Sequence, residues 1–384
     1  AWRDRAVWLG CEGNPVHTEV WVNGHRLGED DRSYLPFRFR IPDAVMGEPE
    51  WLVAIRTDNR AFAPDVPGLE RGWRVHGGLA RPCFLEMASP CHVETLAVTP
   101  GREGDLAVLS VIATVRNDGM SGLQLRVVLD DGPGIGSETA VATWEVESGG
   151  RVVGEAGLHA LALEPWSPDR PARYRFRFEL VAAEGQKLHD RLFRWTGFRS
   201  ISVDGDGLAL NGERIFLRGF NYHADTPGRN HCHDPGQVRE DLQRMRRAGA
   251  NVVRLAHYPH PESTLDLCDA LGLLVIDEIP LYWMRTDGLS PGDFEAKTAA
   301  AERQLDSLIL RDRHHPCVVL WSVSNETLDW QEPVAAVNRS LLNRAQAADP
   351  SRPATHVVCR FWKIENRARH FDTDDILSLN AYPA

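Results

Sequence analysis

From about residue 199 to its end, the chain alternates short apolar runs with amphipathic segments, and this alternation constrains the fold more than any other feature. The apolar runs are rich in β-branched residues and indicate buried strands, whereas the segments between them have the spacing of helices. Strands and helices that alternate through short links form parallel β/α units. The expected strands are 215–220, 251–255, 274–277, 318–323, 354–358 and 376–379, and the expected helices are 237–248, 261–271, 296–311 and 334–348.

The half of the chain before residue 199 has no helical period and predicts two β-sandwiches. In residues 1–90, an alternating run ends in Asn23-Gly24, which is a strong hairpin signal because both turn residues need a positive φ. The chain begins inside what reads as a strand, so we expect a partial, jelly-roll, sugar-binding-like sandwich there. Residues 91–198 contain short strands separated by turns and predict an immunoglobulin-like sandwich. Residues 199–384 then supply about the first six units of a TIM (β/α)8 barrel, which needs eight strands to close.

The net charge, the length of the apolar runs and the Cys spacing limit the classes of partner and cofactor that we expect for this chain. The chain has 384 residues and a formal net charge of -11, which argues against nucleic acid or an anionic membrane as a general partner. No apolar run is long enough to span a bilayer. The seven Cys residues are scattered without zinc-type or redox spacing, so we expect reduced thiols in a cytoplasmic protein. The sequence shows no cluster of metal ligands and predicts no cofactor.

The residues that follow the expected strands are polar. In a barrel of this type they converge on one face, where the active site lies. A single one is weak evidence, because a lone His is usually structural and Asp277 could bond a backbone amide. Together they predict a polar pocket that suits a sugar. They are Asn221 and His223 after the first strand, Arg254 and His257 at the second, Asp277 and Glu278 after the third, Asn325 and Glu326 after the fourth, and Asn380 and Tyr382 after the sixth.

Glu326 is the strongest candidate for chemistry. It follows an apolar run that begins after Pro316 and ends in Asn325, so it is an acid at the carboxyl end of a buried strand. The competing interpretation is that Glu326 only caps the next helix.

These motifs resemble glycoside hydrolase family 2, which includes β-galactosidases, β-glucuronidases and β-mannosidases. The order of the three domains is similar, and the β-glucuronidase and β-galactosidase branch is the most similar. The matching motifs are Val-Trp-Val-Asn-Gly at 20–24, Gly-Phe-Arg at 197–199, Leu-Asn-Gly at 210–212, Leu-Arg-Gly-Phe-Asn at 217–221 with His223, Asn-Val-Val-Arg at 251–254 with His-Tyr-Pro at 257–259, Asp-Glu at 277–278, Arg-Asp at 311–312 with His-Pro at 315–316, Trp-Ser at 321–322 with Asn-Glu at 325–326, and Asn-Ala-Tyr at 380–382.

The resemblance implies a retaining exo-β-glycosidase that hydrolyses terminal β-D-galactosides or β-D-glucuronides by double displacement. It makes Glu326 the general acid/base and Asn325 the partner of the sugar 2-hydroxyl. Arg254 and Tyr382 would hold the nucleophile. The terminal sugar would be bound by His223, His257 and Asp277.

One departure from the family pattern affects the mechanism. Retaining glycosidases use two carboxylates about 5 Å apart, and the family carries its nucleophilic Glu on the seventh barrel strand. We find no matching segment before Ala384 and expect that the sequence is truncated at both ends, with the nucleophile beyond Ala384. Glu278 is the nearest substitute. The alternatives are a catalytically silent carbohydrate-binding relative or an inactive fragment. The sugar cannot be assigned, and a homo-oligomer is possible for this family.

Overall fold

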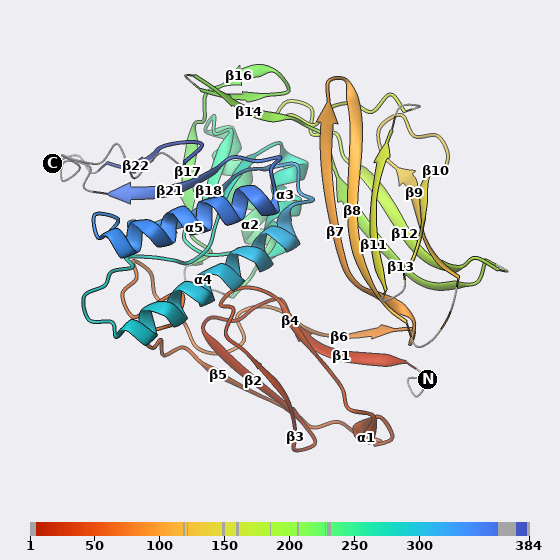
Figure 1. The fold of residues 1–384 in the computed structure, drawn as a ribbon, viewed down its shortest axis with the longest axis horizontal. Helices are drawn as coiled ribbons and strands as arrows, with labels where there is room; N and C mark the ends of the chain where they lie inside the picture. The colour runs from red at the N-terminus through yellow and green to blue at the C-terminus, as the bar shows by residue number, and fades with distance from the viewer. Residues whose placement is uncertain are drawn as a thin grey trace.

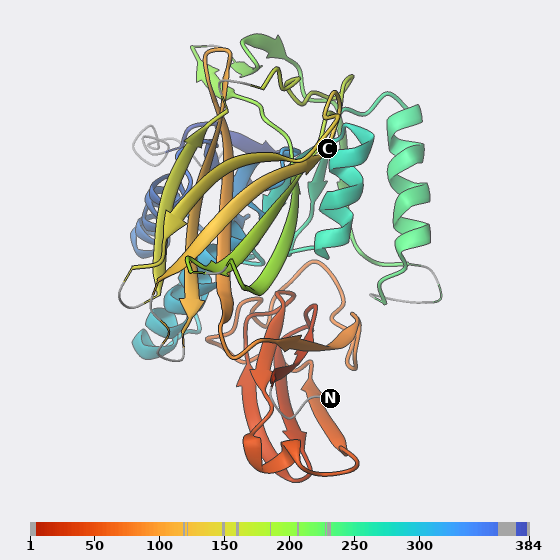
Figure 2. The ribbon, with the colours of Figure 1, turned by 90° about the vertical axis from the view of Figure 1, so that its right-hand side faces the viewer.

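The computed structural model describes residues 5–117, 120, 122–147, 150–158, 161–184, 186–205, 207–226, 228, 232–359 and 374–381. Figures 1 and 2 show three parts, with the N-terminal strands on one side of a larger strand-rich part and of a part that carries the long helices. None of the helices in the described ranges has the length and apolarity that crossing a membrane requires.

The N-terminal part contains two small antiparallel sheets, ordered β4-β1-β6 and β3-β2-β5. Asn23 and Gly24 have φ values of 47° and 80° and form the turn between β2 and β3, which confirms the predicted hairpin. Its elements are β1 (Ala6–Cys11), β2 (His17–Val22), β3 (His25–Asp30), β4 (Phe37–Arg40), α1 (Asp43–Met46), β5 (Val53–Asp58) and β6 (Cys83–Ala88).

The second part has a four-stranded sheet, β10-β9-β12-β13, and a three-stranded sheet, β11-β8-β7. The buried side chains of both sheets form one apolar cluster, as expected for a sandwich. The jelly-roll and immunoglobulin-like assignments and the domain boundaries remain predictions. The strands are β7 (His92–Glu103), β8 (Leu106–Arg116), β9 (Leu123–Asp131), β10 (Thr139–Glu145), β11 (Arg151–Gly157), β12 (Tyr174–Ala182) and β13 (Leu188–Thr196).

The third part is built around a six-stranded parallel sheet, β17-β18-β19-β20-β21-β22, which follows the chain order. This is the incomplete barrel that the strand–helix alternation predicts. Its elements are β17 (Gly219–Tyr222), α2 (Pro235–Arg247), β18 (Val252–Leu255), α3 (Glu262–Leu271), β19 (Leu274–Glu278), α4 (Pro291–Asp312), β20 (Val318–Asn325), α5 (Glu332–Ala348), β21 (Ala354–Cys359) and β22 (Ser378–Asn380).

The start of the first barrel strand differs from the prediction. Ile215 belongs to β16 (Glu213–Ile215), which pairs antiparallel with β15 (Gly207–Leu210), and β15 pairs in turn with β14 (Ile201–Asp204). Asn211 and Gly212 adopt positive φ values of 53° and 80° and turn the chain back into this hairpin. The parallel strand therefore begins only at Gly219.

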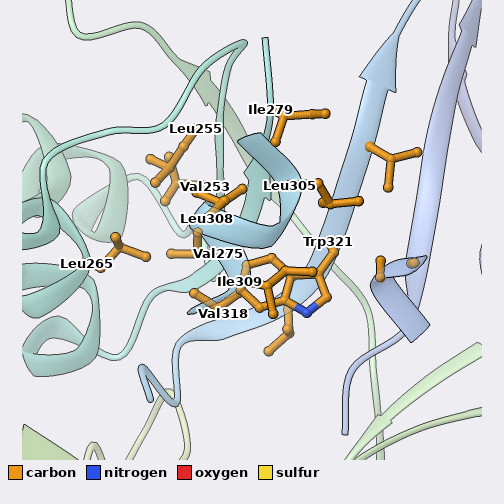
Figure 3. Close-up of a cluster of buried hydrophobic side chains, with 14 of the residues drawn as sticks. Val253, Leu255, Leu265, Val275, Ile279, Leu305, Leu308, Ile309, Val318 and Trp321 are labelled. Atoms are coloured by element: carbon orange, nitrogen blue, oxygen red, sulfur yellow. The ribbon is translucent and has the colours of Figure 1, made fainter. Parts of the chain in front are cut away.

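The core of the barrel part lies between the sheet and its helices. Val253, Val275 and Val318 come from three neighbouring strands and pack with Leu305 and Leu308 of α4, and all five side chains are fully buried (Figure 3). Each such side chain contributes about 1.5–3 kcal/mol by burial. This core fixes the strands whose ends form the site described below.

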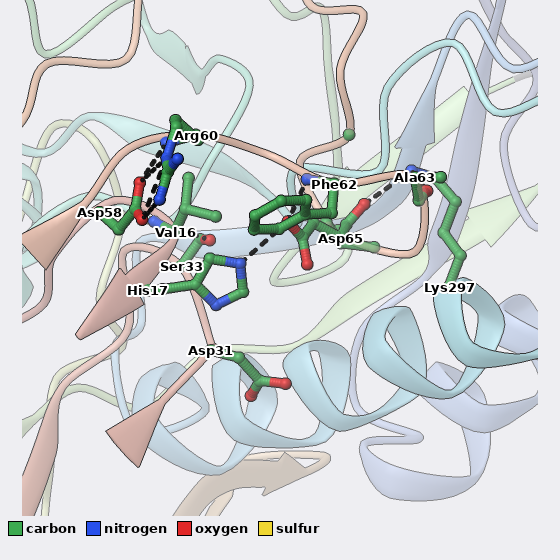
Figure 4. A network of polar contacts seen from close by, with 12 residues as sticks. Val16, His17, Asp31, Ser33, Asp58, Arg60, Phe62, Ala63, Asp65 and Lys297 are labelled. Carbon is green, nitrogen blue, oxygen red and sulfur yellow. Dashed lines mark hydrogen bonds and ion pairs between the residues drawn. The ribbon is translucent and has the colours of Figure 1, made fainter. Parts of the chain in front are cut away.

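A loop of the N-terminal part, residues 59–82, packs against the barrel part. Lys297 of α4 donates from Nζ to the carbonyl of Asp65 at 2.6 Å, and the Asp65 carboxylate lies 3.0 Å from His17 Nε2 (Figure 4). Arg81 donates to the carbonyl of Pro259 at 2.6 Å. These contacts bring N-terminal residues next to the carboxyl ends of β18 and β19.

Candidate active site

Glu326 lies directly after β20 and is 5% exposed. Its amide donates to the carbonyl of Val357 on β21 at 2.7 Å. Within the described residues, the carboxylate accepts hydrogen bonds at 2.9 Å from the indole N–H of Trp283 and at 2.7 Å from the Nδ2 group of Asn380. Its backbone φ is 51°, a conformation that a non-glycine residue adopts only when its surroundings impose it. The fold therefore fixes this acid in one position.

Trp283 reaches Glu326 because the chain after β19 continues alongside the end of β20. The amide of Asn325 donates to the carbonyl of Leu281 at 2.9 Å, and the amide of Trp283 donates to the carbonyl of Asn325 at 3.2 Å. Trp283 also has a positive φ, 48°, and its side chain is 41% exposed. The indole is thus held by backbone bonds while one side of it faces solvent.

Asn325 is oriented by a buried charge pair. Arg254 donates to Glu278 Oε2 at 2.6 Å and to Asn325 Oδ1 at 2.7 Å. Asn380 donates to the same Oδ1 at 3.1 Å. Because Oδ1 must face these donors, Nδ2 points away from them, and it is buried without a hydrogen-bond partner among the described residues. A buried N–H group without a partner is rare in folded proteins and marks a place for a ligand or water.

Glu278 is fully buried and saturated with donors. Besides Arg254, His257 Nδ1 lies 2.7 Å from Oε1, and Ser322 donates from Oγ to Oε2 at 2.6 Å. Burial alone would raise the pKa of this carboxyl, but the charge of Arg254 and the hydrogen bonds from His257 and Ser322 lower the pKa to about 2. Glu278 is therefore a permanent anion that positions Arg254 and His257.

An aromatic group stands beside this network. The ring centroids of His257 and His223 are 5.4 Å apart, and His257 lies 5.9 Å from Trp73 and 5.3 Å from Tyr282. Trp73 belongs to the loop of the N-terminal part, and its indole donates to the hydroxyl of Tyr34 at 3.0 Å. Burial lowers the pKa of His223, so its ring is neutral near pH 7. The group offers flat apolar faces with polar ring atoms at their edges.

Two predicted site residues are not placed there by the structure. Asp277 is fully buried on the opposite side of β19 from Glu278, where its carboxyl faces Asp312. Burial and the nearby Asp312 charge raise the pKa of Asp277 far above its ordinary value. The expectation that Asp277 binds sugar is therefore not supported by its position. Tyr382 lies outside the described residues.

The structure brings four residues to the site that the sequence patterns do not indicate as site residues. Ser322 was noted only as part of a motif. Trp283, Tyr282 and Trp73 carry no signal of their own, although the first two follow the Asp277-Glu278 motif within a few residues. Trp73 is about two hundred residues away in the chain, and only the packing between the two parts brings it close.

Comparison with known proteins shows which family and which relatives this chain is similar to. The family model described as glycosyl hydrolases family 2, TIM barrel domain, matches residues 201–379. A β-glucuronidase of Paenibacillus borealis is 28% identical over 98% of this chain and 64% of its own length. A β-galactosidase of Thermoanaerobacter pseudethanolicus is 30% identical over 92% of this chain and 46% of its own length. The family match identifies the barrel part as a family 2 glycosyl hydrolase TIM barrel domain.

Solved structures show the same relation. β-Glucuronidase 3 of Bacteroides uniformis superposes with a TM-score of 0.81 at 27% identity, over 98% of this chain and 47% of the other. A second neighbour, an FMN-binding β-glucuronidase, has a TM-score of 0.87 at 22% identity and supports the fold alone. The chain thus spans about half to two thirds of the length of these relatives.

Proposed function

We propose that the full-length gene product is a retaining exo-β-glycosidase of family 2 that hydrolyses terminal β-D-galactosides or β-D-glucuronides. The observation that carries the proposal is the fixed carboxylate of Glu326 beside the amide N–H of Asn325, which has no partner among the described residues. Relatives that align over nearly the whole chain are named β-glucuronidase and β-galactosidase, which supports these two substrate classes.

In this proposal Glu326 is the general acid/base. It first protonates the glycosidic oxygen of the leaving group and later removes a proton from the water that releases the sugar. Asn325 Nδ2 donates to the sugar 2-hydroxyl, a contact that strengthens as positive charge develops at the anomeric carbon. His223 and His257 contribute to the subsite of the terminal sugar, with Trp73 as an apolar wall.

Glu278 is unsuited to be the nucleophile. It has no exposed surface, and both of its oxygens are bound by donors. An attacking carboxylate needs a free oxygen within reach of the anomeric carbon. We therefore propose that the nucleophile comes from a segment outside the described residues. Arg254 and Tyr382 would hold this nucleophile in place.

The test is the Glu326→Ala variant of the full-length gene product, assayed on aryl β-galactosides and aryl β-glucuronides. Loss of the acid slows cleavage of a phenyl glycoside by about 10²–10⁴-fold. The 2,4-dinitrophenolate leaving group departs without protonation, so the first step, cleavage of a 2,4-dinitrophenyl glycoside, is nearly unaffected. Azide rescues the second step, release of the sugar from the enzyme, because azide attacks without a general base. Glu295→Ala, at an exposed position of α4, is the control and keeps wild-type rates.

Equal losses on both leaving groups, or no loss, would refute the acid/base role of Glu326. The aryl glycoside that the wild type prefers identifies the sugar. Binding of a sugar without hydrolysis by the full-length gene product would instead assign it as a carbohydrate-binding relative.

A further inference from the structure

A cluster of one Glu and two His side chains, each with a potential metal-ligand atom, lies at the end of β20 opposite to Glu326. Glu262 is the first residue of α3, and His314 and His315 lie in the link between α4 and β20. One potential ligand atom from each of the three lies within 4.8 Å of the others. The length of β20 separates this cluster from Glu326 by roughly 20 Å.

One ring nitrogen of His315 is held by a carboxylate. Its Nδ1 lies 2.6 Å from Asp269 Oδ2, and the other Asp269 oxygen accepts from the Cys317 amide at 2.9 Å. Nε2 of His315 is fully buried and has no hydrogen-bond partner among the described residues. Metal-binding histidines typically carry a carboxylate on their second nitrogen, which fixes the ring and strengthens the free nitrogen as a donor.

His314 and Glu262 complete the cluster from two different elements. The His314 ring centroid is 4.1 Å from that of His315, and its Nε2 lies 3.5 Å from Glu262 Oε1. The His314 side chain is 7% exposed, whereas that of Glu262 is 46% exposed and gives the cluster a path to solvent. The main chain of His314 is held by Thr196, which donates from Oγ1 to its carbonyl at 2.6 Å.

We propose that Glu262, His314 and His315 form a binding site for one divalent transition-metal ion of the Zn²⁺ type. Two imidazoles and one carboxylate are a donor set that Zn²⁺ uses, with water as the fourth ligand. Zinc bonds of about 2.0–2.2 Å in a tetrahedron place neighbouring ligand atoms about 3.3–3.6 Å apart, a range that includes the His314–Glu262 distance of 3.5 Å. Small movements of the exposed Glu262 side chain would complete the geometry.

The ion would join α3 to the link before β20, so its role is structural and independent of the proposed hydrolysis. The second group of potential ligands nearby, Asp269, His315 and Cys317, is a poorer site. Both Asp269 oxygens are already bound, and the Cys317 thiol, whose pKa burial raises strongly, lies 3.6 Å from the carbonyl of Leu265.

The test is a titration of the metal-free, full-length gene product with ZnCl₂ in which calorimetry measures the binding. The zinc content of the protein is then measured after dialysis. We expect one equivalent of zinc and a higher melting temperature with zinc than without it. His314→Asn and Glu262→Gln should each weaken binding at least tenfold and remove the thermal shift. His25→Asn, at an exposed hairpin position, is the matched control and should leave both unchanged.

Glu262→Gln is not expected to disturb folding, because Glu262 is exposed and Gln has nearly the same size and shape as Glu. A loss of zinc binding in this variant therefore reports on the site itself. Zinc affinity that is unchanged in both site variants, or no zinc binding by the wild type, would overturn the proposal. These readouts do not involve glycoside hydrolysis, so they remain decisive whatever the outcome for Glu326.

Discussion

Replacement of Glu278 with Gln tests whether this carboxylate organises the candidate active site. The change keeps the side-chain volume and removes the negative charge that Arg254 and His257 face. Loss of one partner of a buried ion pair costs about 3–5 kcal/mol, because the other charge is left buried. The lowered pKa gives a similar value, since a drop from 4.5 to about 2 corresponds to about 3 kcal/mol of stabilisation. We therefore expect Glu278→Gln to destabilise the barrel part by about 3 kcal/mol at pH 7.

Urea unfolding followed by circular dichroism at 222 nm measures this effect. Within the described ranges, every helix longer than one turn lies in the barrel part, so the signal reports on that part. Because the folded-state pKa is lowered, the stabilisation is present above pH 4.5 and is lost as the pH falls toward 2. The difference in the free energy of unfolding between wild type and variant should be constant from pH 8 to 5 and should narrow below pH 4.5.

Glu295→Gln is the control. A free energy of unfolding for Glu278→Gln within 1 kcal/mol of wild type at pH 7 would refute this account. A difference between the two proteins that stays the same below pH 4.5 would refute it as well.

Three further predictions concern single side chains. Trp283→Phe removes the N–H donor to Glu326, and since hydrogen bonds to a carboxylate favour its ionised form, the alkaline limb of the pH–rate profile of the full-length gene product should move up by about one pH unit. His356 has a pKa of about 9, raised against the effect of burial by two neighbouring carboxyl groups. Wild type should therefore lose about 3 kcal/mol relative to His356→Asn between pH 6.5 and 9, as urea unfolding will show. Burial lowers the pKa of Lys297 to about 8, so wild type should gain about 3 kcal/mol relative to Lys297→Met between pH 8 and 10.5 in the same assay.

Local patterns in the sequence were sufficient to predict the barrel strands and the residues at their ends. Arg254, His257, Asn325 and Glu326 are within one hydrogen-bonded network that runs through Glu278 and Asn380, as parallel strands that end at one face require. The start of the first strand was wrong because Ile215 has the apolar character of a barrel strand but pairs in a local hairpin. Apolar runs alone do not distinguish these two pairings.

Contacts between distant segments could not be predicted in the same way. Trp73 joins the site through packing of the N-terminal part on the barrel part. The cluster of Glu262, His314 and His315 has no recognisable ligand spacing, because α3 and the link before β20 meet only in the folded chain. The chemistry of such residues depends on neighbours that the sequence does not place together.

The neighbouring acids Asp277 and Glu278 show what the sequence leaves open at a strand end and what the fold then decides. Successive residues of a strand point to opposite faces, so one of the two must face the helices and the other the barrel interior. In the register of β19 and β20, Asp277 lies opposite the core residue Trp321 and Glu278 lies opposite Ser322. Glu278 therefore holds Arg254, which in turn fixes the amide of Asn325 so that its N–H group has no partner in the described part of the chain. An acid that orders its neighbours in this way stays charged and fully bound, and for this reason the proposed retaining mechanism assigns the nucleophile to a carboxylate other than Glu278.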